Sequence, residues 1–283
     1  MIYVSTSCVK GEYIKDTIVK YAHAGIKNIE LSGGTKYYKE LEDDIYKLKK
    51  QYGLNYACHA YFPPPIEDFV INLASCNDDI YIKSIKYYEH CIEMLKRLEI
   101  NTLSIHAGFI VEILPENIGR TLNCQVIYPK EKAYNRFVKA YNHINDLCKE
   151  NDICLYLENN VLSEQNYKIF GYKNFLMMTD CNSIKDMKDK LKFNLLLDLA
   201  HLNVSSNSLG LDFCMQAKEL LDMAKWIHLS ENDGVIDQHK LFDKKDNSKI
   251  LSLYKKYKRN DINVTLETKG EIEQIIQCID LLR

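Results

Sequence analysis

The segment Phe193-Asn-Leu-Leu-Leu-Asp198 joins three consecutive leucines to a terminal carboxylate. A run of this kind has no polar face, so it predicts a strand buried on both sides, as in a parallel sheet. Similar β-rich runs recur along the chain. Together they predict eight strands, at residues 2–6, 27–31, 55–59, 102–106, 153–158, 193–198, 226–229 and 262–267.

Amphipathic runs alternate with the predicted strands. Between residues 81 and 98, apolar side chains recur every three or four positions, which is the spacing of one helix face. Helices are predicted at 12–24, 39–52, 81–98, 130–149, 184–191, 211–223, 248–258 and 271–282. This alternation predicts an α/β fold, a single (β/α)₈ TIM barrel. A doubly wound open sheet is the rival architecture, but the count of eight favours a closed barrel.

The length and composition agree with one barrel domain over residues 1–283. A barrel of this kind needs roughly 250 residues, and the chain has 283, with no linker, repeat or low-complexity tract. Hydrophobic residues make up 46% and charged residues 27%, as in ordinary globular proteins. Disorder, collagen and coiled coil are therefore excluded as the main state.

Charge and cysteine usage restrict the expected partners and compartment. The formal net charge is −2, so no excess of positive charge attracts nucleic acid or anionic lipid. No apolar run is long enough to span a membrane, and the first residues lack the pattern of a signal peptide. The ten cysteines form no C-x-x-C pair, which favours reduced thiols in a cytoplasmic protein.

The most informative pattern lies at the ends of the predicted strands. Strands three to eight each finish with a side chain that can bind a metal ion, and the carboxyl ends of barrel strands converge on one mouth. Carboxylates and imidazoles that converge suit Zn²⁺, Mn²⁺, Mg²⁺ or Co²⁺. A metal also removes the cost of burying such groups. The six residues are His59, His106, Glu158, Asp198, His228 and Glu267.

Two short motifs extend this set of donors. Asp198-Leu-Ala-His201 can bring His201 over the same mouth, and Asp237-Gln-His239 falls in the loop after strand seven. An ion site, substrate contacts and support for the metal ligands all remain open for these residues. For His59 and His106, a structural role, a second ion and a substrate hydroxyl are likewise open.

The order and spacing of these motifs resemble the xylose isomerase-like barrel superfamily over nearly the whole chain. That superfamily includes sugar and sugar-phosphate isomerases and epimerases, and also endonuclease IV. The motifs that carry the resemblance are Gly25-Ile-Lys-Asn-Ile-Glu-Leu31, Ser104-Ile-His-Ala-Gly108, Leu157-Glu-Asn159, Leu197-Asp-Leu-Ala-His201, Ile227-His-Leu-Ser-Glu-Asn-Asp-Gly234, Asp237-Gln-His239 and Leu266-Glu267.

The resemblance implies a shared divalent-metal site at Glu158, Asp198, His228 and Glu267. In the isomerases and epimerases, the two glutamates also move the protons of the substrate, at an enediolate that the metal stabilises. The implied substrate is a small sugar or sugar phosphate, and the resemblance does not name it. Barrels of this kind often associate through their outer helices, so a homo-oligomer is an open expectation.

The endonuclease IV branch implies a zinc phosphodiesterase that acts on abasic DNA. There, His59 and His106 would bind a second ion together with Glu158, and three further residues would bind a third. The sequence departs from that branch, because Leu196 replaces a cysteine and Gln238 replaces an arginine of its signatures. The arginine typical of ketose 3-epimerases is also missing, so that subfamily is not assigned. The three residues of the third site would be His201, Asp237 and His239.

Overall fold

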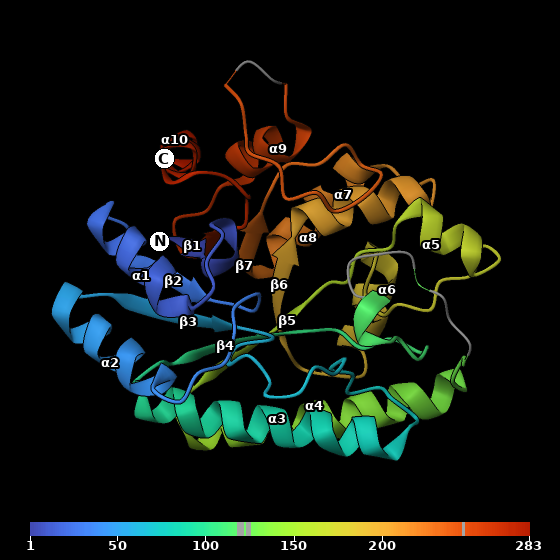
Figure 1. Ribbon diagram of the computed structural model, residues 1–283. Coiled ribbons are helices and arrows are strands. Elements are labelled where there is room, and N and C mark those ends of the chain that lie inside the picture. The colour runs from blue at the N-terminus through green and yellow to red at the C-terminus, as the bar shows by residue number, and fades with distance from the viewer. Residues whose placement is uncertain (118–121, 123–125, 245–246) are drawn as a thin grey trace.

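Eight parallel strands hydrogen-bond in sequence order and close into a barrel in the computed structural model of the chain (Figure 1). The structure describes residues 1–117, 122, 126–244 and 247–283. Strand β1 pairs with both β2 and β8, which excludes the open sheet and confirms the (β/α)₈ barrel. The strands are β1 (Ile2–Ser5), β2 (Asn28–Leu31), β3 (Asn55–His59), β4 (Thr102–His106), β5 (Cys154–Glu158), β6 (Asn194–Asp198), β7 (Ala224–Leu229) and β8 (Asn263–Leu266).

The helices lie around the outside of the strands (Figure 1). Every helix predicted from the sequence is present, with its ends moved by a few residues. The helices are α1 (Ile14–His23), α2 (Leu41–Tyr52), α3 (Asp78–Arg97), α4 (Lys130–Glu150), α5 (Glu164–Ile169), α6 (Cys181–Lys188), α7 (Leu199–Ser208), α8 (Phe213–Met223), α9 (Lys249–Tyr257) and α10 (Ile272–Leu282). Short 3₁₀ turns occur at Thr6–Cys8 and Pro115–Asn117.

Polar caps explain where several helices begin. The Asn77 side chain accepts a hydrogen bond from the backbone of Asp79, so α3 starts three residues before the predicted position. Asp180 caps α6 through the backbone of Ser183 at 3.1 Å, and this also moves that helix toward the N-terminus. These side chains satisfy backbone N–H groups that have no partner inside the first turn.

Two helices were not predicted from the sequence. Helix α7 is buried on nearly every side, so its sequence shows no apolar stripe against a polar face. Helix α5 is the opposite case, because it has six residues and none of them is buried. Amphipathic spacing therefore could not reveal either helix, although the Asp198 carboxylate caps α7 by accepting from His201 N at 2.8 Å.

A layer of large side chains fills the barrel below the mouth. The Trp226 ring packs against Tyr3 and Tyr156, with ring centroids 5.1 and 5.3 Å apart, and its Nε1 donates to Thr265 Oγ1 at 2.8 Å. This layer, called the barrel floor below, closes the interior beneath the polar strand ends. Its members are Tyr3, Ala57, Tyr156, Leu196, Trp226 and Thr265.

The cysteines and the lengths of the helices complete the description of the fold. Nine cysteines are described and all are free thiols, the closest noted pair being Cys58 and Cys91 with Sγ atoms 3.9 Å apart. Cys124 lies outside the described residues. Across the described chain, no helix combines the length and the apolar character needed to cross a membrane.

Candidate metal centre

The carboxyl ends of β5 to β8 bring four metal-type side chains together. Each stands two residues beyond a member of the barrel floor, and the period of two along a strand keeps both on the inner face. Their donor atoms all lie within 4.8 Å of one another, and all four residues are buried. The residues are Glu158, Asp198, His228 and Glu267, the set that the sequence predicts as metal ligands.

Three atoms at the centre of this group have no hydrogen-bond partner in the described structure. They are Glu158 Oε1, Asp198 Oδ2 and His228 Nδ1, and each is buried. An unpaired buried polar atom costs about 1–3 kcal/mol, and an unpaired charge costs more. His228 Nδ1 lies 3.4 Å from Glu158 Oε1 and 3.3 Å from Glu267 Oε2. One imidazole nitrogen and three carboxylates meet here, and three of their buried atoms have no partner, so the group fits a divalent cation.

A second group shares the Glu158 carboxylate. His59 Nε2 lies 2.6 Å from Glu158 Oε2, and His106 Nδ1 lies 3.3 Å from the same oxygen. These three residues also satisfy the spacing of a metal site. The other oxygen, Oε1, faces His228. Glu158 is therefore held between two donor groups, one on each of its oxygens.

A third group is linked in series through one carboxylate. Asp237 Oδ2 lies 3.4 Å from His201 Nε2 and 3.0 Å from His239 Nε2. His201 Nδ1 donates to the carbonyl of Asn159 at 2.9 Å, which turns Nε2 toward Asp237. The loop that carries Asp237 and His239 is anchored at its base, because the backbones of Glu231 and Lys240 exchange two hydrogen bonds. The structure thus brings all nine sequence-predicted residues to one end of the barrel.

The charges of the carboxylates are set by burial and by the histidines. Burial alone would raise the pKa of Glu267, but His228 beside it outweighs burial and holds that pKa at about 2. Burial, together with the neighbouring carboxylates, raises the pKa of Asp198 to about 6, although His201 acts in the opposite direction. Burial alone would also raise the pKa of Glu158, but the surrounding His106, His59 and His228 outweigh burial and lower that pKa.

The two histidines that face Glu158 Oε2 differ in charge. Burial opposes protonation of His59, yet the charge of Glu158 and their hydrogen bond raise the His59 pKa to about 9. Burial prevails at His106 and lowers its pKa to about 4. Without a metal ion, the Glu158 carboxylate is therefore paired with an imidazolium at His59 and a neutral ring at His106.

This pairing predicts how the stability of metal-free protein depends on pH. The His59 pKa is about 9 in the folded state and about 6.5 unfolded, so its contribution is complete below pH ~6.5 and lost as pH rises through about 9. Unfolding free energy should fall by on the order of 3 kcal/mol over that window. Urea midpoints of metal-free protein across pH measure this. His59→Gln should remove only the share of the fall that comes from His59, because the pKa values of His201, His228 and His239 are also raised. His90→Gln, at an exposed position on α3, should leave the fall unchanged. An unchanged slope in His59→Gln would refute the pairing.

One buried carboxylate was missed from the sequence. Glu30, in the middle of β2, is 0% exposed, and both of its oxygens lie 3.2 Å from His228 Nε2. The predicted ligands all stand at strand ends, whereas Glu30 precedes the last residue of its strand. The available signal was a single charged residue within the otherwise uncharged strand Asn28–Leu31.

Asn159 is a second supporting residue next to the centre. Its side-chain oxygen accepts from Asp198 N at 2.8 Å, and its Nδ2 donates to Asp198 O at 3.1 Å. This pair of bonds joins the end of β5 to the end of β6. It fixes the backbone from which the Asp198 carboxylate projects.

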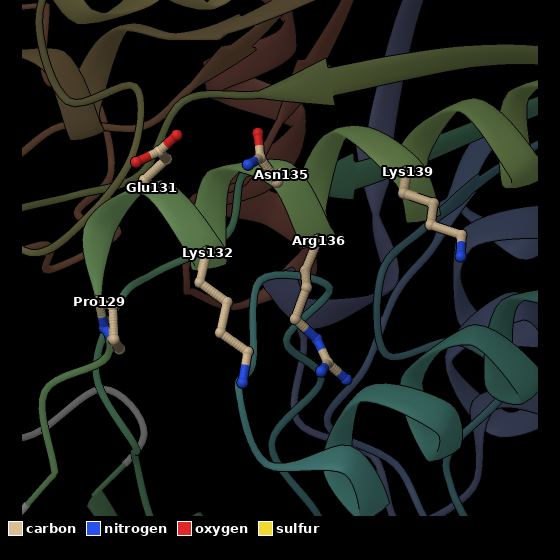
Figure 2. A pocket seen from close by; sticks show the side chains of 6 residues that line it. All are labelled: Pro129, Glu131, Lys132, Asn135, Arg136 and Lys139. Carbon is tan, nitrogen blue, oxygen red and sulfur yellow. The ribbon is translucent and has the colours of Figure 1, made fainter.

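A separate hollow lies on the outer surface of α4 (Figure 2). Lys132, Arg136 and Lys139 point to one side of the helix there, while Glu131 and Asn135 point to the other. The Arg136 guanidinium already pairs with Asp78 at 2.6 Å and stacks on the Tyr81 ring at 3.8 Å. The hollow contains no histidine and one carboxylate, so it lacks the donor set found at the barrel mouth.

With the fold and the site described, comparison with known proteins assigns the family. The family model described as "Xylose isomerase-like TIM barrel" matches residues 18–283. The chain therefore belongs to the xylose isomerase-like TIM barrel family, as the sequence motifs indicated. A curated relative is the uncharacterised protein MJ1614 of Methanocaldococcus jannaschii, 24% identical over 246 residues, which are 86% of this chain and 82% of that protein.

Solved structures of sugar epimerases share the fold. A D-tagatose 3-epimerase-like protein matches with a TM-score of 0.72 and 16% identity, covering 99% of this chain and 95% of that one. D-psicose 3-epimerase from Clostridium cellulolyticum H10, solved with D-tagatose, matches with a TM-score of 0.63 and 14% identity over 100% and 90% of the two chains. At these identities the likeness establishes the common barrel.

Proposed function

We propose that the protein is a divalent-metal-dependent sugar or sugar-phosphate isomerase or epimerase. The observation that carries the proposal is the group of four buried side chains whose donor atoms lie within 4.8 Å of one another. Three of the converging atoms have no partner in the described structure, so the site is prepared for a cation. Glu158, Asp198, His228 and Glu267 would hold the ion, which supplies a positive charge that stabilises negative charge on adjacent substrate oxygens.

Two glutamates flank the place where a substrate carbon would sit. Glu267 is ionised, with a pKa of about 2, and its side chain is 9% exposed. It can therefore accept a proton from a substrate that binds at the mouth. We propose that either Glu158 or Glu267 removes the proton from the carbon next to the substrate carbonyl. The other glutamate then returns a proton to the substrate. Glu158 is fully buried and its Oε2 is bonded to His59 Nε2, so it is the more constrained of the two.

The neighbouring histidines and the floor shape the rest of the reaction. His106 and His201 line the same mouth and would orient substrate hydroxyl groups through their ring nitrogens. The barrel floor excludes water from below, which strengthens electrostatic interactions in the site. The solved relatives named above include a sugar 3-epimerase with D-tagatose, which supports a ketose as the substrate class.

A substrate panel tests the proposal. The protein is incubated with ketoses and ketose phosphates and Mn²⁺, Mg²⁺, Co²⁺ or Zn²⁺, and products are identified by NMR in D₂O. Isomerisation or epimerisation should be accompanied by solvent deuterium at the reacting carbon, because a carboxyl group exchanges its proton with solvent between the two steps. Conversion without any deuterium incorporation would contradict the glutamate mechanism.

A second candidate function is an endonuclease IV-like zinc phosphodiesterase that acts on abasic DNA. The observation that favours it is the sharing of Glu158, whose Oε2 faces His59 and His106 while Oε1 faces His228. The series through Asp237 adds a further donor group. Against it stand the net charge of −2 and the absent nuclease signatures. Under this alternative, zinc-loaded protein cuts an abasic duplex, and His59→Gln or His239→Gln abolishes cleavage.

A further inference from the structure

Glu30 is a fully buried carboxylate on the far side of His228 from the proposed ion. Its two oxygens lie 3.2 Å from His228 Nε2, and both residues are 0% exposed. No lysine or arginine of the described chain forms an ion pair with Glu30. Such a carboxylate is costly unless its partner makes use of the charge.

The hydrogen bonds around Glu30 run in one direction. The Trp226 indole Nε1 can only donate, and it donates to Thr265 Oγ1 at 2.8 Å. The Thr265 hydroxyl is then free to donate its own hydrogen to Glu30 Oε2, 3.0 Å away. Because an ionised carboxylate only accepts, the remaining neighbour, His228 Nε2, must carry a hydrogen and donate it to Glu30.

This chain fixes which nitrogen of His228 is available to a metal ion. A histidine that binds a metal ion is neutral, and with the hydrogen kept on Nε2 its lone pair lies on Nδ1. That atom has no hydrogen-bond partner in the described structure, and it faces Glu158 Oε1 and Glu267 Oε2 at 3.4 and 3.3 Å. Trp226 in the barrel floor thus orients His228 at the mouth through Thr265 and Glu30.

We infer that Glu30 is a positioning residue: it holds the His228 ring with Nδ1 toward the metal ion, and Thr265 and Trp226 hold Glu30. The inference rests on the proposed metal centre. Carboxylates that accept from a metal-bound histidine orient its ring and raise its basicity, and their loss typically costs 10–100-fold in affinity. Glu30 therefore sets the affinity of the ion without contacting it.

The test compares Co²⁺ affinities, because Co²⁺ gives a visible absorption spectrum from which occupancy and ligand geometry are read. Glu30→Gln retains the shape and an accepting oxygen but removes the charge. Its dissociation constant for Co²⁺ should rise by about 10- to 100-fold, with an altered spectrum. Glu12→Gln, an exposed glutamate paired with Lys36, should match wild type. Thr265→Val should raise the constant by a smaller factor, and Thr17→Val, at a buried threonine in α1, should not.

A second measurement on wild-type protein does not depend on any variant folding. Long-range ¹H–¹⁵N NMR of histidine-labelled, Zn²⁺-loaded protein should show His228 with its hydrogen on Nε2. Equal Co²⁺ affinity in wild type and Glu30→Gln, or a hydrogen on Nδ1, would overturn the inference. Wild-type protein that binds no Co²⁺ would instead overturn the proposed metal centre itself, so the two failures are distinct.

Discussion

Glu267→Gln should lower kcat on a responsive ketose by about 10²- to 10⁴-fold while the barrel stays folded. The carboxylate is ionised, with a pKa of about 2, and it is the more exposed of the two glutamates at the centre. Glutamine keeps an oxygen that can face the ion but cannot accept a proton at neutral pH. The loss should therefore appear in kcat more than in KM.

The measurement is turnover by NMR together with metal content and the melting temperature of each variant. Glu273→Gln is the matched control, because Glu273 is an exposed glutamate in the first turn of α10. It should turn over like wild type. Glu267→Gln protein that retains its ion and its activity would remove Glu267 from the proton transfer.

Chelation of the metal should lower the melting temperature by about 10 °C. Without a cation, the mouth holds three buried carboxylates close together, and Glu158 Oε1 and Asp198 Oδ2 have no partner in the described structure. An ion present at about 1,000 times its dissociation constant adds about 4 kcal/mol to stability. For a chain of this length, each kcal/mol corresponds to about 2–4 °C.

Differential scanning fluorimetry with and without EDTA, followed by addition of Mn²⁺ or Zn²⁺, measures the shift. Asp198→Asn should reduce the shift, because an amide is a weaker ligand than a carboxylate. Asp189→Asn, at an exposed position after α6, should show the wild-type shift. A melting temperature that chelator leaves unchanged would favour a non-catalytic barrel that holds no ion.

The fold was predictable because most residues of the strands are buried, on both faces of the sheet. Several strands, such as the one with Leu195-Leu-Leu197, are continuous apolar runs without a polar face, and the eight β-rich segments alternate with amphipathic ones. Helix α7 could not be found this way, because it is packed on nearly all sides and lacks the periodicity that marks a surface helix. Helix α5 buries nothing and lacks the same signal for the opposite reason.

The convergence of the donor residues followed from topology, because the carboxyl ends of barrel strands meet at one mouth. What each residue does there could not be predicted. Glu158 presents one oxygen to His59 and the other to His228. These contacts depend on side-chain rotamers, which the sequence pattern does not specify. Glu30 was missed because it acts from inside a strand on a histidine that is distant in sequence, and only the closed barrel places the two in contact.

Metal content per chain tests the central claim most directly. Elemental mass spectrometry is applied to protein purified without chelator or added metal, with Asp198→Asn in parallel. The account predicts about one divalent ion per chain, exchangeable for Mn²⁺, Mg²⁺ or Co²⁺, and a marked loss of that ion in the variant. About three zinc ions per chain would contradict it in favour of the phosphodiesterase, and no ion in protein that folds normally would contradict a metal centre altogether.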